Sequence, residues 1–221
     1  MIYAIIPARK GSKRIKNKNL KKFAGVPIIK RTIDLCNKLK FFDKIIISSD
    51  CSKILNLTKK IPNTYQILRS KQLSDDYTST ISVIKNVISK INVEKNSIIF
   101  CIYPTSVFLK KKILVQALKV IQKDENNFVF SAKKYAHPIE RSFYKKKKLY
   151  FLKKKSISKR SQDLKYFYHD AAQFYGGSTI AWKKKEIINK NSNFIEIPLN
   201  ESHDIDTIED WKFAEKLWKI L

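Results

Sequence analysis

The sequence predicts an α/β protein with a mostly parallel sheet and an inserted β-arm. Short runs of β-branched residues alternate with helical periods of about a dozen residues, which is typical of βαβ units. The apolar runs at 2–6 and 97–103 are continuous, as expected of strands buried on both faces of a parallel sheet. With 43% hydrophobic residues, the 221-residue chain has enough apolar material for a buried core.

The first half of the chain repeats one strand-and-helix pattern. Pro27 suits the first turn of a helix, and apolar residues recur at helical spacing up to Leu39. A second helical period between Thr78 and Ile91 places its isoleucines and valine on one face. We therefore expect strands at 2–6, 45–47 and 65–68 and helices at 27–39, 51–60 and 78–91.

The second half continues the pattern and then departs from it. We expect a strand at 97–103, a helix at 109–122 and strands at 128–132 and 194–197, with a last helix at 207–221. Thr207-Ile-Glu-Asp resembles a capping box. Residues 140–176 are aromatic and basic without a helical period, and we expect a projecting arm whose hairpin pairs 141–144 with 149–152. Without a linker or repeat, residues 1–221 are expected to form one domain.

The charge and cysteine content exclude several classes of protein. The net charge of +27 comes mainly from lysine runs scattered between apolar segments, and only six arginines are present. A nucleic-acid-binding protein would cluster its cations with arginine on one face, so we favour solvated lysines over a polyanion site and expect no nucleic-acid partner. No window is apolar enough to span a membrane. Three cysteines without CxxC spacing, and an N-terminus whose basic residues follow its apolar run, favour a cytoplasmic protein.

The strongest local signal is the basic loop at residues 6–19, which follows the first strand. An open α/β sheet places its ligand crevice at the carboxyl ends of its strands. The loop holds one glycine, one serine and a dense set of cations, which can cradle a triphosphate. Its glycine spacing fits neither a Walker A loop nor a GxGxxG motif. The alternative is a basic surface loop without a ligand.

Further motifs extend this signal along the whole chain. They are IPARKGSKRIKNKN (6–19), LRSKQLSDDYTST (68–80), CIYPTS (101–106) and DID (204–206). In this order and spacing they resemble the CMP-sialate synthetases, a group of sugar cytidylyltransferases. The resemblance implies a three-layer α/β/α sheet of the Rossmann-like, nucleotidyltransferase type. It also implies that CTP and a nine-carbon 2-keto acid sugar give the CMP-sugar and pyrophosphate, by attack of the anomeric hydroxyl on the α-phosphate of CTP.

Two segments of the arm bear on the identity of the sugar. RSQDL (160–164) and YHDAAQFY (168–175) look most like the branch of the family that activates pseudaminic acid. Tyr103 stands where the sialic acid enzymes have a glutamine, which argues against N-acetylneuraminate. Legionaminate and N-acetylneuraminate remain the alternative substrates. The resemblance also suggests a bacterial surface-glycan or flagellin glycosylation pathway, and a homodimer formed through residues 140–165.

The resemblance carries the nucleotide site onto residues of this chain. Arg9, Lys13 and Lys18 are expected to be catalytic, with Arg9 and Lys13 on the β- and γ-phosphates. The expected nucleotide-binding residues are Ala8, Arg9, Gly11, Ser12, Lys13, Asn19, Arg69, Ser79 and Thr80. Two alternatives stay open: Arg69 could form a surface ion pair with Asp75 or Asp76, and Thr80 could belong to a helix cap.

The expected metal ligands are Asp204 and Asp206. In an extended segment, carboxylates one residue apart face the same side. Two hard oxygen ligands suit Mg²⁺, which is the expected cofactor. The alternative is that Asp206 caps the last helix.

The expected sugar-binding residues lie mainly in the arm. A guanidinium fork suits the carboxylate of a sialic-type sugar, and polar side chains suit its acylamino and hydroxyl groups. The set comprises Tyr103, Arg141, Arg160, Gln162, His169, Asp170 and Gln173. His169 and Asp170 could instead be a structural pair.

Overall fold

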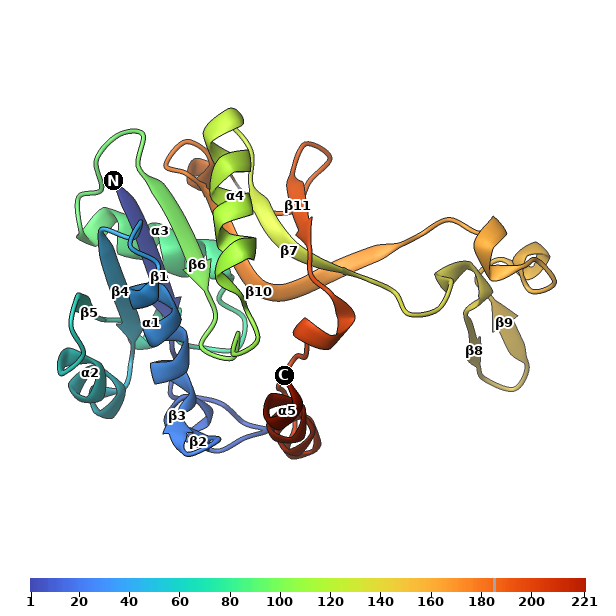
Figure 1. Ribbon diagram of the computed structural model, residues 1–221, viewed down its shortest axis with the longest axis horizontal. Coiled ribbons are helices and arrows are strands. Elements are labelled where there is room, and N and C mark those ends of the chain that lie inside the picture. Colours follow the sequence, from blue (N-terminus) through green and yellow to red (C-terminus); the bar gives the residue numbers. More distant parts are fainter. Residues whose placement is uncertain (185) are drawn as a thin grey trace.

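A seven-stranded sheet forms the centre of the computed structural model, which describes residues 1–184 and 186–221 (Figure 1). Its strand order is β11-β7-β10-β6-β1-β4-β5. The strands are β1 (Ile2–Pro7), β4 (Lys44–Ser49), β5 (Thr64–Leu68), β6 (Ile98–Ile102), β7 (Val129–Lys134), β10 (Tyr168–Ser178) and β11 (Asn193–Glu196). All neighbouring pairs are parallel except those of β10, which runs antiparallel to both β6 and β7.

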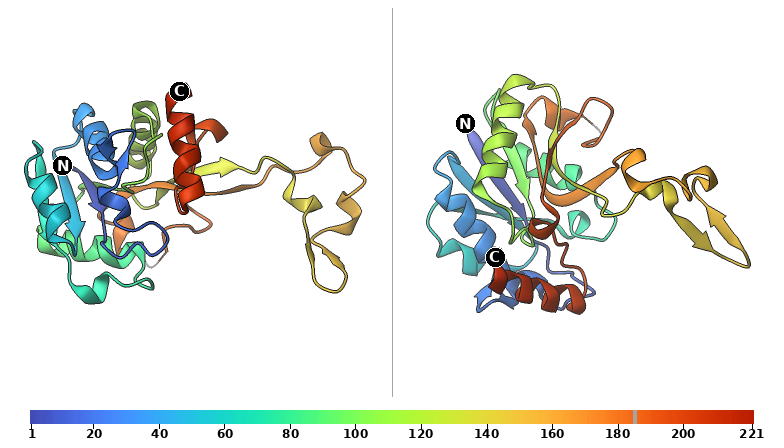
Figure 2. Two further views of the ribbon diagram at one scale, coloured as in Figure 1. Left: turned by 90° about the horizontal axis from the view of Figure 1, so that it is seen from below. Right: turned by 45° about the vertical axis from the view of Figure 1, so that its right-hand side comes forward.

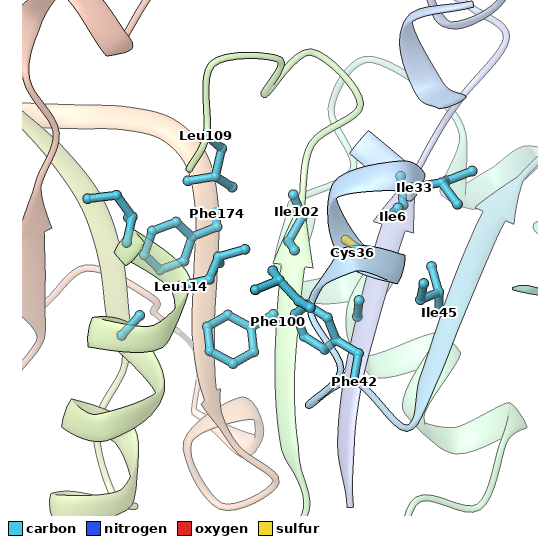
Figure 3. Close-up of a cluster of buried hydrophobic side chains, with 14 of the residues drawn as sticks. Ile6, Ile33, Cys36, Phe42, Ile45, Phe100, Ile102, Leu109, Leu114 and Phe174 are labelled. Atoms are coloured by element: carbon cyan, nitrogen blue, oxygen red, sulfur yellow. The ribbon is translucent and has the colours of Figure 1, made fainter. Parts of the chain in front are cut away.

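The helices cover both faces of this sheet. They are α1 (Ile28–Lys38), α2 (Ser52–Lys59), α3 (Thr80–Lys90), α4 (Lys111–Lys123) and α5 (Ile208–Ile220). Ala4 and Ile6 of β1 pack with α1, α2 and α4 on one face, while Tyr3 and Ile5 pack with α3 on the other. Figure 3 shows the first of these cores, where side chains of α1, α4, β6 and β10 meet. The predicted three-layer α/β/α class is therefore confirmed.

The predicted elements are present, with ends within one or two residues of those expected. Pro27 precedes α1, and Thr207 and Asp210 form a full capping box at the start of α5. Both observations confirm the sequence signals read there. Within residues 1–184 and 186–221, none of the helices has the length and apolar character that crossing a membrane requires.

Helix α5 packs against a small hairpin rather than against the sheet. The hairpin consists of β2 (Lys22–Phe23) and β3 (Val26–Pro27), and Phe23 meets Trp211 of α5 edge-on at 5.6 Å between ring centroids. Ile15 and Ile205 are buried in the same apolar cluster. This cluster therefore fixes the segment before α5 beside the loop that follows β1.

The arm is shorter than the sequence predicted. Strands β8 (Phe143–Lys145) and β9 (Leu149–Phe151) pair as the expected hairpin, which projects far from the sheet (Figure 2). The placement of 168–176 in the arm is wrong, because these residues belong to β10 in the middle of the sheet. A register shift between Asp170 and Tyr175 interrupts the alternation that would reveal a strand.

Candidate active site

A cavity of about 580 Å³ opens at the carboxyl ends of β1, β5 and β6. This is the edge where an open α/β sheet binds its ligands, and the volume is that of a small-molecule site. Its lining comprises Pro7, Arg9, Ser12, Lys13, Arg14, Lys18, Asn19, Arg69, Leu73, Asp75, Asp76, Thr78, Thr80, Val83, Tyr103, Pro104, Thr105 and Asp206. Five cationic side chains face three carboxylates there, which leaves an excess of positive charge for an anionic ligand.

The loop after β1 is anchored at several points. Asn19, which is buried, donates from Nδ2 to the carbonyl of Arg9 at 2.9 Å. The buried Ile15 fastens the middle of the loop to the α5 cluster. Neither Ala8 nor Gly11 lines the cavity. Ala8 is buried and donates its N–H to the carbonyl of Ser48, and a side chain added at Gly11 would meet no other atom. These anchors leave four cationic side chains of the loop directed at the cavity, those of Arg9, Lys13, Arg14 and Lys18.

Two carboxylates hold four of these cations. Asp76 accepts from Arg9 at 2.6 Å and lies 2.5 Å from Lys13 Nζ. Asp206 lies 2.7 Å from Arg14 and 3.2 Å from Lys18. Hydrogen bonds from Lys13 and Arg9 lower the pKa of Asp76 below its usual value. Asp76 therefore holds the two cations that are expected to bind phosphate.

Arg69 has a different environment from the other cations. It is only 5% exposed, and within the described ranges its Nε and Nη2 atoms have no hydrogen-bond partner. Burial lowers the pKa of its guanidinium. The alternative of a surface ion pair with Asp75 or Asp76 is wrong, because Arg69 is buried and Asp76 pairs with Arg9 and Lys13. A buried guanidinium at a cavity wall is instead available to a ligand.

The start of α3 supplies hydroxyl groups to the cavity wall. Ser79 is the N-cap residue and accepts from the N–H of Ser82 at 3.2 Å, so it does not line the cavity. Thr80 is left to face the cavity, where its Oγ1 lies 2.5 Å from the hydroxyl of Tyr103. Capping is thus the role of Ser79, and Thr80 and Tyr103 form one polar pair in the wall.

Asp206 lies in the cavity wall and Asp204 lies beside it. Burial and the charge of Asp206 raise the pKa of Asp204. The alternative that Asp206 caps α5 is wrong, because Thr207 is the N-cap residue and Asp210 completes the capping box. In the described part of the chain, no group of three His, Cys, Asp or Glu side chains could hold a metal ion. Two adjacent carboxylates still fit Mg²⁺, which commonly takes its other ligands from phosphate and water.

The expected sugar-binding residues are separated in the structure. Tyr103 lines the cavity, whereas Arg141, Arg160, Gln162, His169, Asp170 and Gln173 do not line it within one chain. Arg141 donates to the carbonyls of Ile157 and Lys159 and so stabilises the arm itself. Asp170 accepts from Tyr175, and Gln173 is buried and donates to the carbonyl of Glu201 at 2.7 Å.

Sequence reasoning missed several members of the cavity. Arg14 and Asp76 are the most informative, since each takes part in an ion pair at the wall. Both lie inside motifs that the sequence had already singled out, at 6–19 and 68–80. Leu73, Asp75, Thr78, Val83, Pro104 and Thr105 also line the cavity. Arg14 could have been found from the sequence, because it is one of only six arginines and lies within the basic loop.

The fold is of the nucleotidyltransferase type, with a cationic loop after its first strand. Two solved structures share the fold over almost their whole length. CMP:2-keto-3-deoxy-manno-octonic acid synthetase complexed with CTP has a TM-score of 0.72 and 12% identity, covering 99% of this chain and 98% of the other. The 4-diphosphocytidyl-2C-methyl-D-erythritol synthase of Anaerococcus prevotii has a TM-score of 0.69 and 14% identity, covering 99% and 98%. At these identities the likeness concerns the fold alone.

Sequence comparison then gives the family. The model of the cytidylyltransferase family matches residues 3–219, and the chain belongs to that family. The chain is 39% identical to the pseudaminic acid cytidylyltransferase of Campylobacter jejuni subsp. jejuni serotype O:2, covering 98% of this chain and 95% of that protein. It is 28% identical to the CMP-N,N'-diacetyllegionaminic acid synthase of Legionella pneumophila, covering 99% and 97%.

Proposed function

We propose that this protein transfers CMP from CTP to pseudaminic acid and releases pyrophosphate. The observation that carries the proposal is the cationic cavity, which Arg9, Lys13, Arg69 and Tyr103 line together. The 39% identity to a pseudaminic acid cytidylyltransferase supports this choice of sugar. Legionaminate and N-acetylneuraminate are the alternative substrates within the same reaction.

The residues of the cavity suit an in-line displacement at phosphorus. The anomeric oxygen of the sugar forms a bond to the α-phosphorus, and the bond from that phosphorus to the oxygen of pyrophosphate breaks. Positioning and charge stabilisation carry most of the catalysis of phosphoryl-type transfers. Arg9 and Lys13 stabilise the negative charge of the departing pyrophosphate, and Lys18 fixes the Asp206 segment by donating to the carbonyl of Ile205 at 2.7 Å. Arg69 binds the cytidine part. Thr80, which the sequence assigned to the nucleotide, is assigned here to the sugar side together with Tyr103, because their hydroxyl groups are hydrogen-bonded.

Pyrophosphate release tests the reaction and the sugar together. CTP and Mg²⁺ are supplied with pseudaminic acid, legionaminic acid or N-acetylneuraminic acid in parallel. We expect release with pseudaminic acid alone. Release only with another sugar would contradict the sugar assignment and keep the reaction. No release from folded protein with any of the three would contradict the proposed function.

Asp204 and Asp206 are proposed to hold Mg²⁺. Burial, and after it the charge of Asp206, raise the pKa of Asp204, and a bound divalent cation would favour the ionised form of both carboxylates. When bound, the ion would neutralise part of the negative charge of the triphosphate. Arg14, which neutralises Asp206 in this structure, would then be free to contact the triphosphate, while Lys18 keeps its hydrogen bond to the carbonyl of Ile205.

Asp206→Asn is expected to raise the Mg²⁺ concentration needed for half-maximal activity about tenfold or more. The substitution preserves shape and removes the anionic oxygen that the ion needs. The measurement is the rate of pyrophosphate release over a range of Mg²⁺ concentrations. Asp34→Asn, on helix α1, is the matched control and should leave the Mg²⁺ dependence unchanged. An unaltered dependence in Asp206→Asn would remove this residue from the metal site.

The projecting arm is proposed to mediate a homodimer. Its hairpin exposes Phe143, Tyr144, Tyr150 and Phe151 to solvent, and such a group of aromatic side chains is typical of an interaction surface. Arg160 and Gln162 belong to the segment between β9 and β10 and do not line the cavity of their own chain. In a dimer they are available to a sugar bound in the partner subunit.

Phe143→Asp is expected to convert the dimer to a monomer at micromolar concentration. A buried carboxylate without a partner opposes association, because its desolvation is not compensated. Sedimentation velocity measures the result. Phe213→Asp is the control, since Phe213 on α5 is exposed to nearly the same extent as Phe143 (55% against 57%). Equal effects of both substitutions would place the interface elsewhere.

We also place the reaction in the cytoplasm. The three cysteines are free and buried, as expected of a chain that folds under reducing conditions.

A further inference from the structure

Strand β10 contains a bulge whose two ends are joined by hydrogen bonds to one carboxylate, that of Asp170. The pairing of β10 with β7 changes register between Asp170 and Tyr175, and Ala172 within this stretch has φ +48°. An alanine adopts this left-handed conformation only where its surroundings impose it. Asp170 Oδ1 accepts the N–H of Ala172 at 2.8 Å, and Oδ2 accepts the hydroxyl of Tyr175. Asp170 therefore spans the bulge from one end to the other.

The bulge determines the position of a cavity wall. It directs the carbonyl of Gln173 at the end of β6, where that oxygen accepts the N–H of Tyr103 at 3.2 Å and the hydroxyl of Ser106 at 2.7 Å. Residues 103–105 between these two anchors line the cavity. The Asp170 bulge is thus linked to the wall by hydrogen bonds although Asp170 itself does not line it.

Tyr175 gives a second link to the same wall. Its ring meets the ring of Tyr103 edge-on, with 5.9 Å between centroids and an interplanar angle of 84°. Asp170 fixes the hydroxyl of Tyr175, and Thr80 fixes the hydroxyl of Tyr103. Burial raises the pKa of both tyrosines, so both remain neutral hydrogen-bonding groups. The rotamer of Tyr103 is therefore supported from two sides.

We infer that Asp170 is a positioning residue for the sugar, acting through the β10 bulge and Tyr175 on the wall formed by Tyr103. This inference rests on the proposed function. Within the described ranges, no hydrogen bond joins Asp170, Gln173 or Tyr175 to the loop at residues 8–19 or to Arg69. Asp170 therefore acts on the wall that we assign to the sugar, and not on the groups that we assign to CTP. A small displacement of a wall can cost a large factor in rate.

Three substitutions test the inference by separating sugar affinity from CTP affinity. Asp170→Ala removes both acceptors and should raise the KM for the sugar about tenfold or more, with the Kd for CTP changed less than about twofold. Asp170→Asn keeps one acceptor and should give an intermediate KM. Tyr175→Phe keeps the ring, loses the fixed hydroxyl and should give a smaller rise. Tyr65→Phe, on the exposed face of β5, is the control and should match the wild type.

Hydrogen exchange of the backbone gives a readout that needs no sugar. In Asp170→Ala the amides of Tyr103 and Ser106 should exchange faster, while those of β1 keep the wild-type rates. Folded Asp170→Ala with an unchanged sugar KM, or with equal losses of sugar and CTP affinity, would overturn the inference. If wild-type protein releases no pyrophosphate with pseudaminic acid, the proposed function fails. Unchanged exchange at Tyr103 and Ser106 would then separately refute the positioning role.

Discussion

We expect Lys13→Ala to lower kcat about a hundredfold or more. Removing one donor that stabilises charge in a transition state typically costs this factor. The Lys13 side chain is 82% exposed and its ammonium lies 2.5 Å from Asp76, so it is held at the cavity without being buried. Because the pyrophosphate charge develops as the bond to the α-phosphorus breaks, a cation held at this place acts on the chemical step. The kcat of both proteins is measured as steady-state pyrophosphate release at saturating CTP, Mg²⁺ and sugar.

Lys16→Ala is the matched control for this substitution. Lys16 belongs to the same loop but lines a separate hollow, together with Lys10, Lys21 and Lys53. Its removal changes the net charge equally and should leave kcat unchanged. If both substitutions have the same effect, general electrostatics explains the loss. If Lys13→Ala retains wild-type kcat, Lys13 has no part in the mechanism.

Arg69→Met is expected to stabilise the free protein and to abolish most CTP binding. A buried guanidinium without partners for Nε and Nη2 destabilises the folded state, and replacing buried charge with an apolar side chain of similar length often stabilises by about 1 to 3 kcal/mol. The same substitution removes the charged group that a nucleotide would satisfy. We expect the Kd for CTP to rise about 30-fold or more.

Urea unfolding and CTP titration together test this pair of effects. Lys71→Met is the control, since Lys71 lies in an exposed turn two residues after Arg69. It removes one cation and should change neither the free energy of unfolding nor the Kd for CTP. A destabilised Arg69→Met protein would show that Arg69 is satisfied in the free state. Unchanged CTP affinity would assign Arg69 a role outside the nucleotide site.

Helix and strand positions could be predicted from the sequence because local burial determines them. Apolar residues at helical spacing marked α1 and α3, and continuous apolar runs marked β1 and β6. Strand β10 escaped detection, since it contains a bulge and two glycines. A Cβ at Gly176 would lie 2.8 Å from Ile121, so the sheet requires glycine where a propensity argument disfavours a strand.

The candidate site was predictable where one motif supplies several side chains. Arg9, Ser12, Lys13, Lys18 and Asn19 come from a single loop after β1, and the structure places all of them at the cavity. The sugar-binding set was less predictable, because only Tyr103 lines the cavity, while the other members lie in the arm and in β10. Gln173 and Asp170 have types that suit a sugar, yet their hydrogen bonds are to the protein itself.

The sequence by itself determined the layers of the fold, the phosphate-type loop and the family. Each of these depends on side-chain types at short, regular spacing. Only the tertiary structure decided that β10 lies between β6 and β7 and that Asp76 holds Arg9 and Lys13. It also decided that Arg69 is buried, with no hydrogen-bond partner for Nε and Nη2 among residues 1–184 and 186–221. These are pairings across long sequence separations, where hydrogen bonds and desolvation depend on which groups the packed sheet brings together.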